Sequence, residues 1–316
     1  MKGFVRMSKR KLTLILAVVM MVSMLPFYAF AEDGPAPEKN GWDGNMYYKN
    51  GTAVTGAVYI NGPVTVNKKV KYYYNKKKKK WQTKKIKKAK TTYKKVSQTD
   101  NADILYLFDA DGKLVVSNAG VFTHDGKEYY SLGGGKLQTG WVAVGKQAMY
   151  FNRNDAKTGT AGSMAKNTTV GHLHVPANGR LGEAYALGVK QLNKSGWSLK
   201  SAYKFSYKLK YRNRGYRQKT TEKYAIRGFK KKNGNCYVMA STFYIMAKLL
   251  GYDVTRVAGK VAGVNPHSWT VIKENGKEHV YDPNFRNETG RSGWKIWYGK
   301  KGTWRYTNYH KVKNLY

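Results

Sequence analysis

Residues 234–251 read Gly-Asn-Cys-Tyr-Val-Met-Ala-Ser-Thr-Phe-Tyr-Ile-Met-Ala-Lys-Leu-Leu-Gly, and this stretch decides how the second half of the chain folds. Apolar residues recur in it at steps of three and four, at Ala240, Phe243, Ala247 and Leu250. This spacing predicts a helix that is buried along one face and ends at Gly251. Cys236, the only cysteine in the chain, falls on the first turn. The positive end of a helix favours the thiolate, which is the nucleophilic form of cysteine.

Three strands are predicted downstream of this helix, at residues 254–258, 267–272 and 278–282. Asn275 and Gly276 separate the last two strands, and Asn-Gly is the strongest short hairpin signal. A two-residue turn there places Trp269 opposite Asp282. In that register His267 and Asp282 are diagonal neighbours on one face, roughly 7–8 Å apart at the backbone. The sequence therefore predicts a hydrogen-bonded histidine and carboxylate.

Each of these residues also has an ordinary structural interpretation. A lone cysteine is usually a small buried apolar residue, and an aspartate before a proline is a common turn residue. His267 by itself is more often a structural or surface histidine. Taken together, the chain order, the helix start and the hairpin register favour a nucleophile, a base and a residue that orients the base.

These motifs, with Asn265-Pro266-His267-Ser268-Trp269 and Tyr281-Asp282-Pro283, resemble those of the transglutaminase-like superfamily over residues 178–290. The resemblance implies an α+β, papain-like thiol fold, with Cys236 as nucleophile, His267 as general base and Asp282 as its partner. It also implies chemistry on amide bonds of peptides or proteins that needs neither a metal nor an organic cofactor. Three functions stay open: acyl transfer that crosslinks proteins, hydrolysis by a cysteine peptidase or amidase, and adhesion by a non-catalytic relative.

The family also uses an upstream aromatic residue beside the cysteine amide to stabilise the oxyanion. Four tyrosines precede Cys236 at suitable positions, and the sequence does not choose among Tyr203, Tyr207, Tyr211 and Tyr216.

The chain begins with the three-part pattern of a secretory signal. Basic residues precede an apolar run at residues 12–27, and a small-x-small site follows at Ala29-Phe30-Ala31. We expect cleavage after Ala31; the alternative is an uncleaved membrane anchor, for which the run is short. The protein is therefore expected outside the cell or at the cell wall, without a stable membrane span after cleavage.

The charge of the chain predicts polyanionic neighbours. Residues 1–31 hold five of the 58 basic residues and none of the 18 acidic ones, which leaves a charge of +35 on the remainder. Since the signal indicates export and no nucleic-acid motif is present, anionic wall polymers or a membrane surface are expected rather than nucleic acid. A single cysteine permits no internal disulfide, so folding must depend on burial.

Residues 32–166 are predicted to be β-hairpin repeats. The passages that begin at Tyr47, Tyr106 and Tyr129 share an aromatic residue, a glycine-centred turn and a short second strand. They resemble the cell-wall-binding repeats of the choline- and glucan-binding type, which implies binding of wall glycans through aromatic residues. Several of the tryptophans typical of those repeats are absent, which argues against choline as the ligand, and a spacer is the alternative.

A lysine-rich insert, Lys68–Lys95, interrupts these repeats and carries interleaved aromatic residues. It is expected either to grip a polyanion or carbohydrate, or to form the solvated basic tip of a degenerate repeat. Residues 167–179 are predicted to be a linker, in which His172 and His174 are loop residues rather than metal ligands. The transglutaminase-like domain then occupies residues 167–316, with helices expected after Asn178, near Tyr203 and from Thr221 to Phe229.

Overall fold

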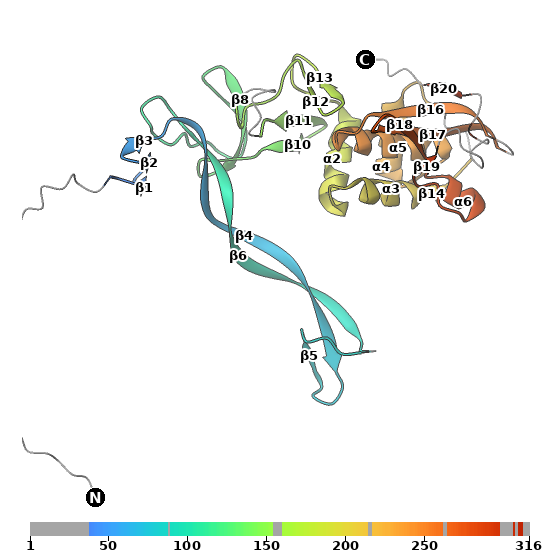
Figure 1. Ribbon diagram of the computed structural model, residues 1–316, viewed down its shortest axis with the longest axis horizontal. Coiled ribbons are helices and arrows are strands. Elements are labelled where there is room, and N and C mark those ends of the chain that lie inside the picture. Colours follow the sequence, from blue (N-terminus) through green and yellow to red (C-terminus); the bar gives the residue numbers. More distant parts are fainter. Residues whose placement is uncertain are drawn as a thin grey trace, which may run out of the picture.

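The computed structural model describes residues 38–87, 89–153, 160–213, 217–261, 264–297, 306 and 309–311. The predicted export signal, residues 1–31, lies outside the described residues. The described chain is a mixed α+β structure with an N-terminal β region, a long projecting ribbon and a C-terminal body of helices and strands (Figure 1). In the described part of the chain, no helix combines the length and the apolar character needed to cross a membrane.

The N-terminal region consists of short antiparallel strands joined by tight turns. A three-stranded sheet is followed by a six-stranded sheet of order β5-β4-β6-β9-β8-β7 and by two separate hairpins. The strands are β1 (Gly41–Asp43), β2 (Met46–Lys49), β3 (Thr52–Ala53), β4 (Gly56–Asn75), β5 (Lys80–Gln82), β6 (Thr91–Phe108), β7 (Gly120–His124), β8 (Lys127–Gly133), β9 (Lys136–Leu137), β10 (Gly140–Val144), β11 (Gln147–Phe151), β12 (Thr168–Val170) and β13 (Leu173–Val175).

Turn chemistry explains the hairpins of this region. Asp125 and Gly126 join β7 to β8 with φ angles of 46° and 70°, the left-handed pair that a two-residue turn requires. The hairpins bury small clusters of apolar side chains: Leu105, Leu107, Tyr129 and Leu137 form one, and Met149, Phe151 and Met164 form another. Strands β4 and β6 continue far beyond these clusters, so the lysine-rich insert is the end of an extended ribbon rather than a short loop.

The C-terminal body contains five helices among the described residues: α2 (Glu183–Ser195), α3 (Leu199–Tyr207), α4 (Thr221–Lys231), α5 (Cys236–Leu249) and α6 (Phe285–Thr289). Its main sheet has the order β19-β18-β17-β16-β20. These strands are β16 (Val254–Val261), β17 (Val264–Glu274), β18 (Lys277–Tyr281), β19 (Ile296–Trp297) and β20 (Tyr309–Lys311), and two short parallel strands, β14 (Lys210–Tyr211) and β15 (Asn233–Gly234), pair separately.

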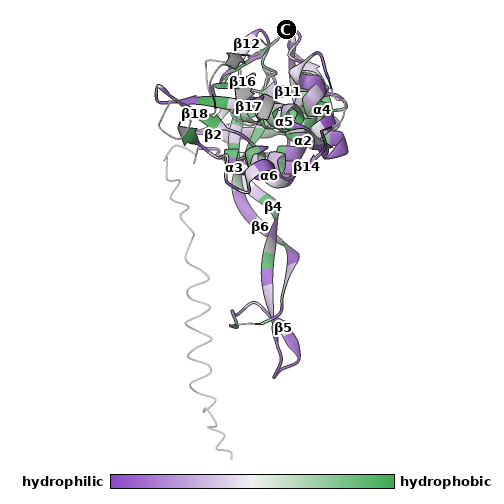
Figure 2. Cartoon of the chain, turned by 90° about the vertical axis from the view of Figure 1, so that its right-hand side faces the viewer, coloured by the Kyte–Doolittle hydropathy of each residue, from purple (hydrophilic) through white to green (hydrophobic). Residues whose placement is uncertain are grey.

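Helix α5 is the centre of this body (Figures 1 and 2). Burial along one face is a wrong prediction, because every residue of α5 except Tyr237 and Lys248 is buried. The helix packs against α2, α3 and α4 and against strands β16 and β17. At Gly228 of α4 the two helices approach so closely that a Cβ would lie 2.0 Å from the Thr242 hydroxyl oxygen.

Residues 167–179, predicted to be a linker, form the β12–β13 hairpin instead, with Leu173 and Val175 buried. The junction on either side of it is packed. Ala148 of β11 and Leu181 exchange two backbone hydrogen bonds of 2.9 Å, and Ala148 lies in the same apolar core as α2 and α5. Arg180 also forms an ion pair with Glu128 of β8. The β region and the helical body are therefore joined by direct contacts.

Candidate functional site

Cys236 is the first residue of α5, and the residues before it fix the helix start. The Asn235 side chain accepts a hydrogen bond from the Val238 amide at 3.3 Å, which is an N-cap. Gly234 is required next to it, because a Cβ there would lie 2.4 Å from the Val238 side chain. The first amides of a helix, here those of Cys236 and Tyr237, have no acceptor within the helix. The sulfur therefore lies beside backbone donors that can bind negative charge.

His267 and Asp282 come together as the register predicts. Asn275 and Gly276 form the turn with φ angles of 50° and 75°, and β17 pairs with β18 from Glu274 opposite Lys277 to Thr270 opposite Tyr281. The Nε2 atom of His267 lies 2.8 Å from Oδ2 of Asp282, and each side chain is only 1% exposed.

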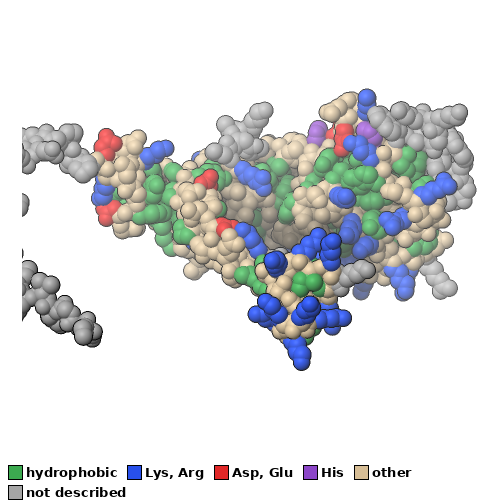
Figure 3. Space-filling model, turned by 60° about the horizontal axis from the view of Figure 1, so that its bottom comes forward, with side chains coloured by type: hydrophobic (Ala, Val, Ile, Leu, Met, Phe, Trp, Pro, Cys, Tyr) green, Lys and Arg blue, Asp and Glu red, His purple; other side chains and the backbone are tan. Residues whose placement is uncertain are grey.

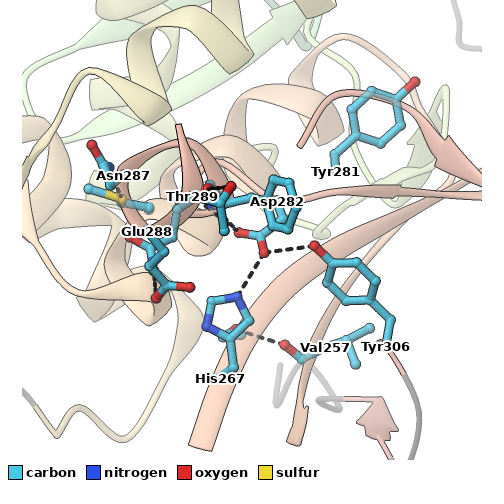
Figure 4. Close-up of polar contacts among 12 residues, drawn as sticks. Val257, His267, Tyr281, Asp282, Asn287, Glu288, Thr289 and Tyr306 are labelled. Carbon is cyan, nitrogen blue, oxygen red and sulfur yellow. Dashed lines mark hydrogen bonds and ion pairs between the residues drawn. The ribbon is translucent and has the colours of Figure 1, made fainter. Parts of the chain in front are cut away.

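Four donors converge on the Asp282 carboxylate. Oδ1 accepts the backbone amides of Asn284 at 2.9 Å and Phe285 at 3.1 Å, while Oδ2 accepts the Tyr306 hydroxyl at 3.1 Å as well as His267 (Figure 4). This set of donors suits the ionised form, which only accepts hydrogen bonds. Tyr306 is absent from the sequence prediction.

The surroundings of His267 decide its charge. Burial lowers its pKa, but the charge and hydrogen bond of Asp282, with a smaller contribution from Cys236, outweigh burial and raise the pKa to about 10. The ring is therefore an imidazolium at neutral pH. Within the described residues, its Nδ1 atom has no partner in hydrogen-bonding geometry, so the interaction with the sulfur is looser than that with Asp282.

Arg256 of β16 is a second buried cation beside the site, and the sequence prediction missed it. Its guanidinium donates to the hydroxyls of Thr221 at 3.1 Å and Ser268 at 3.1 Å, and it lies 5.8 Å from the ring centre of Tyr237. Arg256 therefore contacts the neighbour of Cys236 and the neighbour of His267 at once. Burial lowers its pKa, and the surrounding tyrosines and Glu222 counteract this effect.

The structure separates the four tyrosines that the sequence left equivalent. Tyr203 is buried and donates to the backbone carbonyl of Asp282 at 3.0 Å. The ring of Tyr207 lies under the guanidinium of Arg286, 5.0 Å from its centre, and Tyr216 lies outside the described residues.

Tyr211 is the remaining candidate among the four tyrosines, and it lies near the Cys236 sulfur. Strand β14 pairs with β15 so that Tyr211 is level with Gly234, two residues before Cys236. Partial burial raises the pKa of the Tyr211 hydroxyl first, and the negative charges of Cys236 and Glu288 raise it further. The side chain is 39% exposed, so it lies at the rim of the site rather than in the core.

Trp42 marks a second candidate site, in the N-terminal region. Its side chain is 45% exposed, and its ring lies 5.3 Å from Tyr47, 5.1 Å from Tyr106 and 5.8 Å from Phe108. Clusters of this kind can hold a cation or a sugar face. No group of three or more His, Cys, Asp or Glu side chains in the described ranges is arranged to hold a metal ion. His172 and His174 lie on the β12–β13 hairpin, where the His172 carbonyl accepts from Lys248.

Comparison with known proteins gives structural similarity only. No family model matches the chain, and no curated protein matches it. The N-terminal part resembles the choline binding domain of Spr1274 from Streptococcus pneumoniae, at 26% identity over 24% of this chain and 82% of that domain, with a TM-score of 0.18. It also resembles CbpF, solved in complex with ipratropium, at 21% identity over 45% of this chain and 53% of that chain, with a TM-score of 0.18.

The C-terminal part distantly resembles "a Putative Cysteine Protease from Cytophaga hutchinsonii", at 14% identity over 42% of this chain, with a TM-score of 0.29. The chain spans about half the length of that protein, 47%, and of CbpF.

Proposed function

We propose that this protein is an exported thiol enzyme that acts on amide bonds at the cell surface. The observation that carries the proposal is the buried His267–Asp282 pair beside a cysteine at a helix start. Cys236 is assigned as the nucleophile and His267 as the acid and base. Asp282 is assigned as the residue that orients the His267 ring and stabilises its protonated form.

The first half-reaction transfers an acyl group to the enzyme. The Cys236 thiolate attacks the amide carbonyl carbon, a carbon–sulfur bond forms, and the carbonyl oxygen becomes an oxyanion beside the Cys236 amide. The His267 imidazolium then donates its proton to the leaving nitrogen as the carbon–nitrogen bond breaks. Ammonia or an amine departs and a thioester remains.

The second half-reaction releases the acyl group. His267, now neutral, takes a proton from an incoming amine as its nitrogen attacks the thioester, and the thiolate leaves with the bonding electrons. Transfer to an amine crosslinks proteins, while attack by water makes the protein a peptidase or amidase. Both outcomes use Cys236, His267 and Asp282 in the same roles.

Tyr211 is assigned as a second donor to the oxyanion, since among the three described candidates Tyr203, Tyr207 and Tyr211 it is the one whose hydroxyl interacts with the Cys236 charge. Loss of one oxyanion donor lowers kcat on the order of 10²-fold. Tyr211→Phe should therefore lower kcat to that extent with little change in KM. Tyr207→Phe is the matched control and should leave kcat within about twofold. Equal effects of the two substitutions would contradict the assignment.

The deciding experiment for the function uses a glutamine-containing protein and a labelled primary amine. Incorporation of label supports acyl transfer, and cleavage without incorporation supports hydrolysis. If the protein is a non-catalytic adhesin, neither incorporation nor cleavage is expected. In that case iodoacetamide should also label Cys236 at neutral pH at the same rate in the wild type and in His267→Ala.

Attachment to the wall is assigned to the aromatic cluster around Trp42. The choline binding protein CbpF has been solved with ipratropium and with a peptidoglycan analogue. We assign quaternary ammonium groups or sugar faces as ligands of this cluster, because ring faces attract both. The protein would then act on proteins or peptides of the wall to which it is bound.

A further inference from the structure

The ribbon formed by β4 and β6 extends away from every core of the molecule (Figure 1). Ile60 is its last buried residue on β4, and none of the side chains described from Asn61 to Asn75 or from Thr91 to Ile104 is buried. The strands nevertheless stay paired as far as Tyr73 opposite Thr91. At about 3.3 Å per residue the ribbon reaches roughly 50 Å beyond its last core contact. A two-stranded ribbon without a packed face is marginally stable in water, so its shape is not explained by burial.

The outer part of this ribbon, Lys68–Lys95, is the most charged segment of the chain. It holds 15 lysines and no arginine, aspartate or glutamate. Lys68 pairs with Asp100 at 3.0 Å, at the inner end of the segment. The lysines beyond it therefore have no carboxylate in their own segment to neutralise them. Figure 3 shows this end of the ribbon coming forward as a projection dense in lysine side chains. We call residues 68–95 the lysine arm.

Some ammonium groups of the lysine arm lie over tyrosine rings of the same segment. The Nζ atom of Lys71 lies 5.5 Å from the ring centre of Tyr73 and 5.7 Å from that of Tyr93. On the opposite face, where Val70 is level with Lys94, the Nζ of Lys94 lies 5.7 Å from the ring centre of Tyr72. Both faces of the ribbon therefore present cations held above rings, a cation–π arrangement that orders long lysine side chains.

We propose that the lysine arm binds a linear phosphodiester polymer, of the polyol-phosphate class found in cell walls, with phosphates along both faces of the ribbon. Charge complementarity carries this inference: a row of unneutralised ammonium groups matches a polymer with regularly spaced phosphates. Binding would also relieve the repulsion among the lysines and so stabilise the ribbon. The inference rests on the surface location in the proposed function but not on the thiol chemistry, so a catalytic failure leaves it intact.

Two observations favour a polyol phosphate over single-stranded nucleic acid. Proteins that bind single strands stack bases on open aromatic faces, whereas the rings of Tyr72, Tyr73 and Tyr93 each have a lysine ammonium over one face. The segment also uses lysine alone, which binds phosphate as a point charge, and lacks the planar fork by which arginine reads nucleic acids. The lysine arm is therefore suited to binding closely spaced phosphates rather than nucleic-acid bases.

The test measures binding of the purified protein to a synthetic poly(glycerol phosphate), to oligothymidylate of the same number of phosphates, and to uncharged dextran. If about six lysines engage phosphates, the slope of log K against log salt is near −4, and affinity for the polyol phosphate falls on the order of 10²-fold between about 50 and 200 mM salt. We expect the polyol phosphate to bind at least as tightly as the oligothymidylate, and dextran not to bind.

Replacement of the five tip residues Lys76–Lys80 by glutamine should weaken polyol-phosphate binding by more than tenfold and flatten the salt slope by about 3. The matched control removes the same charge from the helical body by replacing exposed lysines with glutamine: Lys194, Lys200, Lys204, Lys208 and Lys223. It should change the affinity by less than about threefold. Tighter binding of oligothymidylate, equal loss in both variants, or no binding of the polyol phosphate would each overturn the proposal. Circular dichroism checks that both variants remain folded.

Discussion

Replacement of Asp282 by asparagine tests the charge of the site most directly. The carboxylate is 1% exposed and receives two donors on each oxygen. Asparagine has nearly the same shape, but one of its two terminal groups is an NH2. If that NH2 faces the Asn284 and Phe285 amides, donors point at donors. If it faces His267, it can donate only to a neutral ring that has lost the proton on Nε2. The variant loses both the charge that holds the His267 proton and part of the hydrogen bonding.

The magnitude follows from the pKa of His267. The folded protein raises this pKa from 6.5 to about 10, and Asp282 is the largest influence in that direction. At about 1.4 kcal/mol per pKa unit, the charged ring contributes about 5 kcal/mol to folding. Because the folded pKa is the higher one, this contribution is complete below about pH 6.5 and is lost as the pH rises through about 10. The ring is buried, so solvent screening does not reduce it.

The assay is urea unfolding followed by tryptophan fluorescence at a series of pH values from about 6.5 to about 10. Other groups titrate over the same range, so the quantity of interest is the difference between wild type and Asp282→Asn. We expect Asp282→Asn to be less stable by about 3–5 kcal/mol at neutral pH, as for removal of one partner of a buried ion pair. The difference should shrink as the pH approaches 10. Asp253→Asn, in the same body, should keep the wild-type slope.

Reactivity of the thiol gives an independent readout of the same change. At neutral pH, Asp282→Asn should react with iodoacetamide more slowly than the wild type, because a neutral imidazole no longer stabilises the thiolate. An unchanged pH slope together with an unchanged rate of alkylation would refute the reasoning, since both depend on the charge that Asp282 places on His267.

Three further predictions concern single side chains. Tyr306→Phe removes one hydrogen bond to Asp282 and should cost about 1 kcal/mol, measured as a shift in the urea midpoint, with alkylation slowed less than in Asp282→Asn. Gly228→Ala places a methyl group against Thr242 between α4 and α5 and should destabilise the protein by about 1–3 kcal/mol, seen as a lower Tm. Trp42→Ala should elute from isolated cell walls, or from a choline-coated matrix, at lower ligand concentration than the wild type; unchanged retention would favour the spacer interpretation.

Local signals account for the parts of the site that the sequence predicts. The Asn275-Gly276 turn fixes which residues of β17 and β18 face each other, because a two-residue turn leaves no freedom of register. The position of Cys236 at a helix start follows from Asn235 and from the apolar spacing after it. Both inferences use residues that are close in sequence.

Other features depend on contacts between distant residues, and the sequence pattern does not contain them. Tyr306 reaches Asp282 from the C-terminal tail, and Arg256 joins β16 to α4 through Thr221. The burial of α5 on all sides had a usable signal, since Lys248 is its only charged residue and a helix that is apolar all round is buried. No sequence signal predicted the length of the ribbon, because its alternating residues bury neither face.

The packed junction connects the two proposed activities. The two hydrogen bonds between Ala148 and Leu181, the Arg180–Glu128 ion pair and the shared core leave little freedom between the β region and the body that carries Cys236. A protein held on a polymer by the lysine arm or by Trp42 would therefore meet substrates on that polymer at a high effective concentration. It would also present the sulfur in a restricted set of orientations. Substrate choice would then follow from which amide bonds lie within reach of the attached protein, and a weak intrinsic preference at the thiol site would be sufficient.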